Sequence, residues 1–465
     1  MRICYNNAYI LLKIRFFIIM NIQLSDHFTF KKLFRFTLPT VAMTIFSSIY
    51  IIIDGFFVSN FAGSTAFAAV NIVMPVLMIF TSVGFMVGTG GNALVAMTLG
   101  QGDKKRANEI FSLLVYFLIA MGVILDIIGY IFIEDIVIKL GATPEMLPLC
   151  LQYARISLIS LIPYMLQNLF QSFMITAERP ALGFVITLIA GGANIGLDAF
   201  LVGGLGMGVS GAATATVISE FLGGVIPLIY FFSRNKTRLR LGATHFYPKA
   251  ILKTCANGSS ELMGFIAASI VNILYNIQLM NYSGEAGVAA YGVLMYFFVL
   301  AEGVFMGYSM GVSPIIGYDH GADDRRELSN VFKKSILIIC VCSVAITALA
   351  ELGAPIFAGI FVGYDESLYR LTISAFRIYS VSFILMGLNL FGSSLFTALN
   401  NGLISAVISF ARTLVFEVLC ILLLPRIFGI NGIWSSVIVA ECGAFILTLT
   451  FLIVFRKKYG YSFKG

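Results

Sequence analysis

One short polar turn occurs twice in this chain of 465 residues, as Leu99-Gly-Gln-Gly-Asp-Lys-Lys105 and as His320-Gly-Ala-Asp-Asp-Arg-Arg326. The two copies lie 221 residues apart, and the same offset places Asn168-Leu-Phe-Gln-Ser172 on Asn389-Leu-Phe-Gly-Ser393. Sequences rich in Phe, Leu and Gly often match by chance, so total identity carries little weight. Polar and glycine matches that cluster in one register instead indicate an internal duplication.

The residues around both copies are too apolar for a water-soluble protein. Hydrophobic residues make up 59% of the chain and charged residues 11%, whereas a soluble domain carries about 25% charged residues. We therefore expect an integral membrane protein. The three His and seven Cys are scattered without ligand spacing, so neither a zinc site nor a disulfide framework is predicted.

About 20 apolar residues of helix cross a hydrocarbon core about 30 Å thick. Apolar runs broken by Gly, Pro and charged residues predict twelve spans, at residues 36–59, 67–98, 109–133, 149–175, 182–203, 208–232, 251–281, 288–316, 335–357, 371–397, 403–424 and 431–455. Each copy of the duplication holds six spans, and an even number of crossings gives both copies the same orientation. The expected fold class is an all-α membrane protein with twelve transmembrane helices in two parallel-related six-helix lobes.

The spans divide the chain into five parts. These are a cytoplasmic N-terminal segment (1–35), an N-lobe (36–232), a cytoplasmic linker (233–250), a C-lobe (251–455) and a cytoplasmic tail (456–465). Residues 1–19 either extend the first segment or precede a true start at Met20. Lys13 and Arg15 interrupt their apolar run, and no small-residue cleavage site follows, which argues against a signal peptide.

Lys and Arg in the loops orient the chain. The loops on the side of both termini hold 24 of the 30, and the opposite loops hold three. Loops rich in Lys and Arg stay in the cytoplasm, so both termini of this multi-pass cell-membrane protein are expected there. The net charge of +7 is thus explained by topology, and no nucleic-acid partner is expected. The remaining three of the 30 basic residues lie inside spans, at Arg155, Arg377 and Arg412.

Four polar residues of the N-lobe are predicted to lie at one depth. Asp54, Asp198 and Thr216 each fall about 8 to 12 Å below the outer surface at 1.5 Å per helical residue, and Asn194 shares a helix face with Asp198. Two carboxylates, an amide and a hydroxyl at matching depth suit a proton relay or an all-oxygen site for a hard cation. The alternative is that the acids only cap helix ends or meet lipid headgroups.

The C-lobe does not repeat this set, because the offset replaces Asp54 with Tyr275. It carries its own charged residues inside spans, namely Glu261, Glu302, Arg412 and Glu417. Glu261 and Arg412 lie at similar depth and can pair, and a structural ion pair is the favoured interpretation of Arg412. For Glu261 and Glu302, binding of an ion or a cationic substrate competes with structural pairing. Glu220 and Glu441 match in the repeat, which favours a shared packing role.

These residues together resemble the multidrug and toxic compound extrusion (MATE) family, from about Lys31 to Lys458. The resemblance rests on the following segments: Ile51-Ile-Ile-Asp-Gly-Phe-Phe-Val58, Gly100-Gln-Gly-Asp103, Asn194-Ile-Gly-Leu-Asp198, Gly206-Met-Gly-Val-Ser-Gly-Ala-Ala-Thr-Ala-Thr216 and the second turn, Gly321 to Arg326. It implies a two-lobe antiporter, and not an enzyme, that expels cationic or amphipathic compounds in exchange for Na⁺ or H⁺. No cofactor besides this coupling ion is expected, and the chain is expected to act as a monomer in the lipid bilayer.

The resemblance also implies site residues. Asp54, Asn194, Asp198 and Thr216 match the family's N-lobe cation-binding positions, which makes Na⁺ at Asp54 and Asp198 an expectation, and Glu261 matches the acid that many bacterial members have in span 7. The acid that some members have in span 10 has no match, because 371–397 contains only Arg377 as a charged residue. Glu302 is the candidate substitute.

Two other functions compete with this interpretation. A lipid-linked oligosaccharide flippase of the same superfamily would need a strongly basic cavity to meet pyrophosphate. The spans contain three Arg against five cavity-candidate acids, at Asp54, Asp198, Glu261, Glu302 and Glu417, which favours a cationic substrate. The interpretation as a membrane enzyme has even less support, because no nucleophile and base occur together in the sequence. No ATPase motif appears either, so transport is expected to run on an ion gradient.

Overall fold

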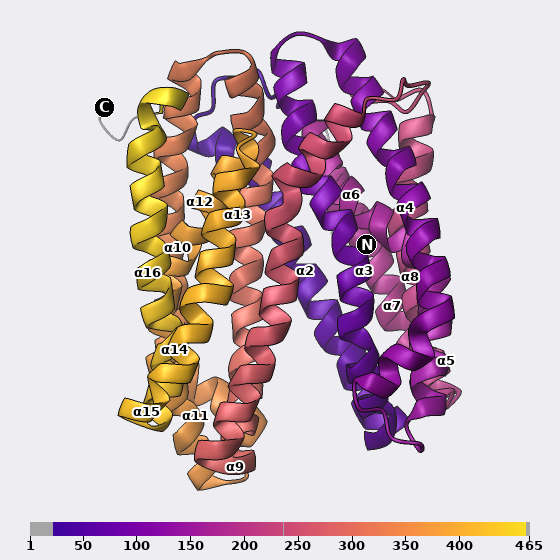
Figure 1. Cartoon of the computed structure of the whole chain (residues 1–465), viewed down its shortest axis with the longest axis vertical. Coiled ribbons are helices and arrows are strands. Elements are labelled where there is room, and N and C mark those ends of the chain that lie inside the picture. Colours follow the sequence, from indigo (N-terminus) through magenta and orange to yellow (C-terminus); the bar gives the residue numbers. More distant parts are fainter. Residues whose placement is uncertain (1–21, 236, 462–465) are drawn as a thin grey trace, which may run out of the picture.

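The fold was analysed in a computed structural model, which describes residues 22–235 and 237–461. The question of the start codon, at residues 1–19, lies outside the described residues. Helices form nearly all of the described chain, and Figure 1 shows its first half on the right and its second half on the left.

The first half contains six apolar crossings. They are α2 (Phe30–Phe57) with the π-helical η1 (Val58–Ala62), α3 (Ser64–Gly100), α4 (Lys104–Lys139), α5 (Leu147–Leu158) with α6 (Leu161–Thr176), α7 (Pro180–Leu197) with the π-helical η2 (Asp198–Gly204), and α8 (Gly208–Phe232). α5 and α6 form one span bent by 55°. The bend falls at Ile159, four residues before Pro163, whose ring clashes with the carbonyl at that distance in a straight helix.

The second half also contains six. They are the two arms of α9 (Pro248–Gly321), α10 (Arg325–Val362), α11 (Glu366–Tyr379) with the 3₁₀ turn η3 (Ser380–Ser382) and α12 (Phe383–Ala398), α13 (Gly402–Phe410) with the π-helical η4 (Ala411–Glu417), α14 (Val418–Leu423) and α15 (Pro425–Phe428), and α16 (Ile430–Tyr459). Gly284 divides α9, because its φ of 62° and ψ of −151° are not helical. The predicted twelve-helix, two-lobe fold is therefore confirmed.

The two copies of the polar turn fold alike. α3 ends at Gly100 and Asp103 caps α4, accepting a hydrogen bond from the Arg106 N–H at 3.0 Å. α9 ends at Gly321, and Asp324 caps α10 by accepting from the Glu327 N–H at 2.9 Å. The residue before each N-cap has a positive φ, which is +82° at Gly102 and +54° at Asp323. The duplication thus preserves the helix stop, the turn and the N-cap.

The two lobes contact each other near these turns. This end of the molecule, which also carries residues 233–235 and 237–247 of the linker, is called the linker face and lies at the top of Figure 1. A Cβ atom at Gly100 would overlap the Tyr318 carbonyl oxygen, and one at Gly321 would overlap the Met97 carbonyl oxygen. The two copies of the turn therefore pack directly on each other across the lobes.

Further inter-lobe contacts continue toward mid-membrane. Cβ atoms at Gly90 in α3 and Gly258 in α9 would each overlap the backbone of the facing helix. Glycine at these two positions therefore allows the helices to approach closely. On α2, the Thr44 hydroxyl donates to the Gly303 carbonyl oxygen at 2.6 Å. Beyond this depth the two halves diverge toward the end opposite the linker face (Figure 1), here called the far face.

Residues 22–29, here called the N-terminal strap, join both lobes at the linker face. The strap's His27 Nδ1 lies 2.6 Å from Glu327 Oε2 of α10, and the Phe28 N–H donates to the same carboxylate at 2.8 Å. The Leu24 N–H donates to Glu178 in the first half at 2.8 Å. Leu24 and Phe28 are fully buried, so the strap seals the contact between the lobes.

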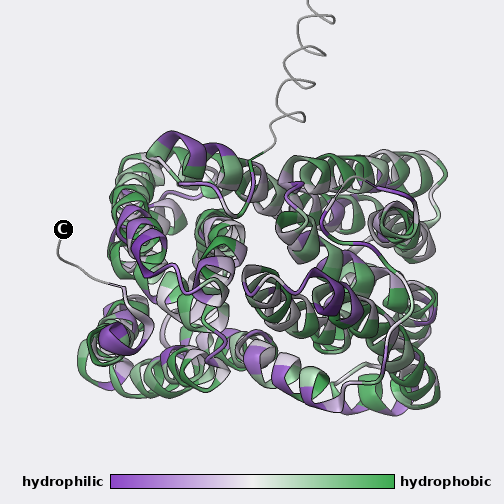
Figure 2. Cartoon of the chain, turned by 90° about the horizontal axis from the view of Figure 1, so that it is seen from above, coloured by the Kyte–Doolittle hydropathy of each residue, from purple (hydrophilic) through white to green (hydrophobic). Residues whose placement is uncertain are grey.

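Figure 2 looks onto the linker face with the chain coloured by hydropathy. Hydrophobic residues cover most of the helices, and hydrophilic residues gather at the ends and in the connections. Many large apolar side chains point outward, for example Ile127 on α4 and Val454 on α16. Such a surface requires a lipid environment.

Candidate cation site in the first lobe

Asp54 and Asp198 face each other near the far ends of their spans. Asp54 lies in the last turn of α2, and Asp198 is the first residue of η2. Their carboxyl groups interact electrostatically, although no hydrogen bond joins them. Both are buried, with exposed fractions of 8% for Asp54 and 0% for Asp198. Two spans far apart in sequence therefore bring their acids together.

The oxygens of this group lack hydrogen-bond donors within the described residues. Asp54 Oδ1, both carboxylate oxygens of Asp198 and Asn194 Oδ1 are buried without a partner. Asn194 stands one helical turn before Asp198 on the same face of α7. An ionised carboxylate only accepts hydrogen bonds, and two facing carboxylates repel each other. A proton or a cation between them removes this conflict.

Both acids adjoin π-helical turns. η1 starts four residues after Asp54, and the Val58 N–H donates back to the Asp54 and Gly55 carbonyl oxygens. η2 starts at Asp198 itself. A π-helical turn widens the backbone and is frequent at functional sites. Apolar periodicity alone does not predict these turns, because the same apolar run is compatible with α or π hydrogen bonding.

The fourth predicted residue, Thr216, lies on α8. It is half-buried on α8, and the unpartnered oxygens of Asp198 show that its hydroxyl makes no hydrogen bond to that acid. The structure thus assembles Asp54, Asn194 and Asp198, while Thr216 lies on the neighbouring helix without a bond to Asp198.

A third acid of the first lobe, Glu220, lies near the pair. It accepts a hydrogen bond from the Ser160 hydroxyl and interacts electrostatically with Asp54. Tyr50 on α2 interacts with both Glu220 and Asp54. Sequence reasoning assigned Glu220 to packing because of its repeat match. Its spacing of four residues from Thr216, on the same face of α8, was the available signal.

In the second lobe, Arg412 neutralises a buried acid. Its Nε lies 2.7 Å from Glu441 Oε1, and the Asn389 side-chain amide donates to Glu441 Oε2 at 2.6 Å. The suggested pair with Glu261 is therefore wrong, because η4 packs Arg412 against α16, which carries Glu441. The favoured interpretation of Arg412 as a member of an ion pair agrees with the geometry.

Other acids of the second lobe lie around this pair. Arg412 also interacts electrostatically with Glu302 and Glu417, and Glu302 interacts with Glu261. Tyr275, at the repeat position of Asp54, lies beside Glu417. The second lobe therefore holds an arginine-centred acidic cluster, whereas the described acids of the first lobe's site have no basic partner.

Comparisons with known proteins agree with this architecture. The MatE family profile matches residues 39–200 and again 262–422, one match in each lobe. The chain is 25% identical over 432 residues to "Multidrug export protein MepA" of Staphylococcus haemolyticus (strain JCSC1435), covering 92% of this chain and 94% of that protein.

Solved structures share the fold. One, described as MATE in complex with MaL6, superposes with a TM-score of 0.88 at 23% identity, covering 93% of this chain and 98% of the other. Another, described as the outward-facing conformation of a multidrug resistance MATE family transporter of the MOP superfamily, has a TM-score of 0.87 at 23% identity, covering 93% and 97%.

Proposed function

This chain belongs to the MatE family, and from that premise we propose that it is a monomeric secondary-active exporter of cationic or amphipathic compounds, driven by antiport of Na⁺ or H⁺. The observation that carries the proposal is the group of buried, donor-less oxygens of Asp54, Asn194 and Asp198. Oxygen ligands suit a hard cation, and carboxylates also accept protons. The name of the MepA relatives, multidrug export, supports the substrate class.

The coupling follows from charge. An ion bound between Asp54 and Asp198 neutralises their repulsion and favours the arrangement in which α2 and η2 are close. A cationic substrate is attracted only while carboxylates stay ionised, so the ion and the substrate oppose each other's binding. This coupling is reciprocal and typically amounts to about 1–3 kcal/mol. Alternating occupancy of the two is what antiport requires.

The proposed orientation has the linker face in the cytoplasm, in accord with the Lys and Arg distribution of the loops. The lobes contact each other at that face and diverge at the far face. In this orientation the structure corresponds to an outward-facing state, in which the cation site lies nearer the open end.

The comparisons give no support to the flippase alternative. A pyrophosphate headgroup needs uncompensated basic side chains in the cavity, but Arg412 is bound to Glu441 and Arg155 lies 3.9 Å from Glu134. The acids that remain favour a cation over an anion.

Transport of a cationic dye in proteoliposomes tests the proposal. Na⁺ and pH gradients are imposed separately, and we expect one of them to drive dye movement in the wild type. Asp54→Asn and Asp198→Asn should each abolish driven transport while expression and thermal stability stay near normal. Arg377→Gln, an exposed change on α11, is the matched control. Undiminished transport by either Asp variant would refute the proposed site.

A further inference from the structure

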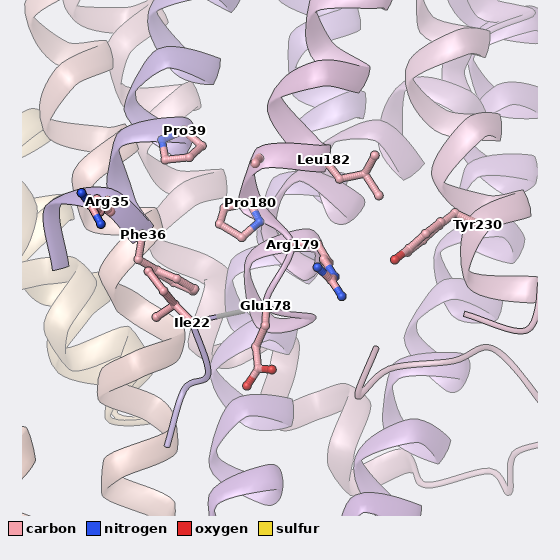
Figure 3. A pocket seen from close by; sticks show the side chains of 10 residues that line it. Ile22, Arg35, Phe36, Pro39, Glu178, Arg179, Pro180, Leu182 and Tyr230 are labelled. Atoms are coloured by element: carbon pink, nitrogen blue, oxygen red, sulfur yellow. The ribbon is translucent and has the colours of Figure 1, made fainter. Parts of the chain in front are cut away.

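A second site, unrelated to the buried acids, opens at the linker face between α2, α7 and α8. Figure 3 shows this cavity of about 190 Å³. Phe36, Pro39, Pro180 and Leu182 form apolar walls. Its polar lining includes Arg35, Glu178, Arg179 and Tyr230. The cavity therefore joins an apolar wall to a basic rim.

Positive charge exceeds negative charge at this rim, although Arg179 also interacts electrostatically with Glu178. Arg35 and Arg179 form no ion pair within the described residues. The single lining acid, Glu178, is already engaged, because Arg238 Nε lies 3.0 Å away and the Leu24 N–H donates to it at 2.8 Å. Figure 3 shows the Tyr230 hydroxyl pointing toward the Arg179 guanidinium. Two cationic groups and a hydroxyl thus remain for an anion.

The cavity lies where lipid headgroups are expected. The predicted spans begin at residues 36 and 182 and end at 232, which places Arg35, Arg179 and Tyr230 at the membrane boundary. The same ends of α2 and α8 carry exposed apolar side chains, with Phe34 55% exposed and Phe232 53% exposed. Apolar surroundings do not stabilise a free phosphate, whereas they stabilise the acyl chains of a lipid.

We propose that this cavity binds the headgroup of an anionic phospholipid, with the phosphate beside Arg179 and Tyr230, Arg35 adding positive charge from the opposite side of the cavity, and the acyl chains on the apolar surface of the membrane-facing helices. Basic pockets between transmembrane helices on the cytoplasmic side are suited to such headgroups. The bound lipid would bridge α2 to α7, the two helices that carry Asp54 and Asn194. The proposal rests on the proposed orientation of the linker face, but not on the direction of transport or on the coupling ion.

The test measures the midpoint of thermal unfolding of the full-length protein in detergent during titration with dioctanoyl phosphatidylglycerol. Dioctanoyl phosphatidylcholine and inorganic phosphate are titrated in parallel. Arg35→Gln and Arg179→Gln remove one charge each, and Tyr230→Phe removes the hydroxyl. Arg240→Gln, an exposed linker arginine outside the cavity lining, is the matched control. Lipid-free unfolding midpoints confirm that each variant is folded.

Phosphatidylglycerol should raise the midpoint more than either other titrant. Each cavity arginine variant should need about fivefold more phosphatidylglycerol to reach half of the maximal rise in the midpoint. This factor corresponds to about 1 kcal/mol, the usual contribution of one basic residue near a membrane surface. The control should respond like the wild type. An equal response to phosphatidylcholine, a full response to phosphate alone, or wild-type titrations by both arginine variants would overturn the proposal. If Arg179→Gln fails to fold, Arg35→Gln and Tyr230→Phe still decide it.

Discussion

Glu220 and Glu441 occupy the same place in the two repeats, yet only Glu441 has a cationic partner. The difference arises at the position of Arg412, which the 221-residue offset aligns with Gly191. In the first lobe, a Cβ at Gly191 would lie 2.7 Å from the Phe46 ring and 2.9 Å from the Tyr50 ring. Aromatic side chains therefore fill the space that a long basic side chain would need.

Arg412→Leu should destabilise the protein strongly, because it leaves Glu441 buried without a cation. Removing one partner of a buried ion pair costs about 3–5 kcal/mol, whereas replacing both by apolar residues is often neutral. We therefore expect a large drop in the thermal unfolding midpoint for Arg412→Leu and recovery in Arg412→Leu/Glu441→Leu. Equal instability of the single and double variants would contradict this account of the pair.

Binding of a cationic dye should weaken as the coupling ion is raised. Protons or Na⁺ between Asp54 and Asp198 remove the negative charge that attracts the dye, so the dissociation constant should rise with added Na⁺ or with lowered pH. Titrations in nanodiscs measure this dependence, and Asp198→Asn should lose it. Affinity that is indifferent to both ions, or a preference for anionic dyes, would refute antiport.

Among the elements, apolar run length predicted the spans well and their fine structure poorly. The predicted spans 251–281 and 288–316 fall within the two arms of α9, which break at Gly284. The π-helical turns η1, η2 and η4 could not be predicted, because the choice between α and π hydrogen bonding depends on neighbouring helices. The same holds for the Arg412 partner, since four acids lie at usable depth and only packing selects Glu441.

Gly258→Ala should disfavour the closed linker face. Its Cβ would overlap the Met86 carbonyl oxygen across the lobes, whereas Gly264 in the same helix has no atom within 4 Å of an added Cβ. Maleimide labelling of a cysteine introduced at Thr98, a buried residue of α3, reports opening of the linker face. The labelling rate should rise in Gly258→Ala and stay unchanged in Gly264→Ala. Equal rates would show that this contact does not govern closure.

For the whole molecule, the duplication predicted two parallel lobes but not which end is closed. Closure depends on many small contacts, such as those at Gly100 and Gly321, whose partners lie in the opposite lobe. Likewise, matching depth grouped Asp54, Asn194, Asp198 and Thr216 as the predicted site. Depth along a helix does not specify the direction of a side chain, so the sequence could not predict that Thr216 makes no hydrogen bond to Asp198.

The orientation is tested by cysteine labelling in an otherwise cysteine-free chain. Gly242→Cys in the linker has open space around an added Cβ, and it should resist an impermeant maleimide applied outside intact cells. Tyr364→Cys, at an 84% exposed position beyond α10, should react rapidly. The reverse pattern would invert the proposed topology.

The N-terminal strap has a consequence for biogenesis on the ribosome. His27 meets Glu327, which lies 300 residues later in the chain. At a synthesis rate of about 5–20 residues per second, roughly 15–60 s pass between the synthesis of His27 and that of Glu327, its partner in the second lobe. Leu24 and Phe28 lack their final burial during that interval, so a nascent chain stalled before Glu327 should be cut in the strap by a protease that leaves the finished protein intact. The six spans of the first lobe must therefore insert and hold their places before the contact that seals them to the second lobe exists.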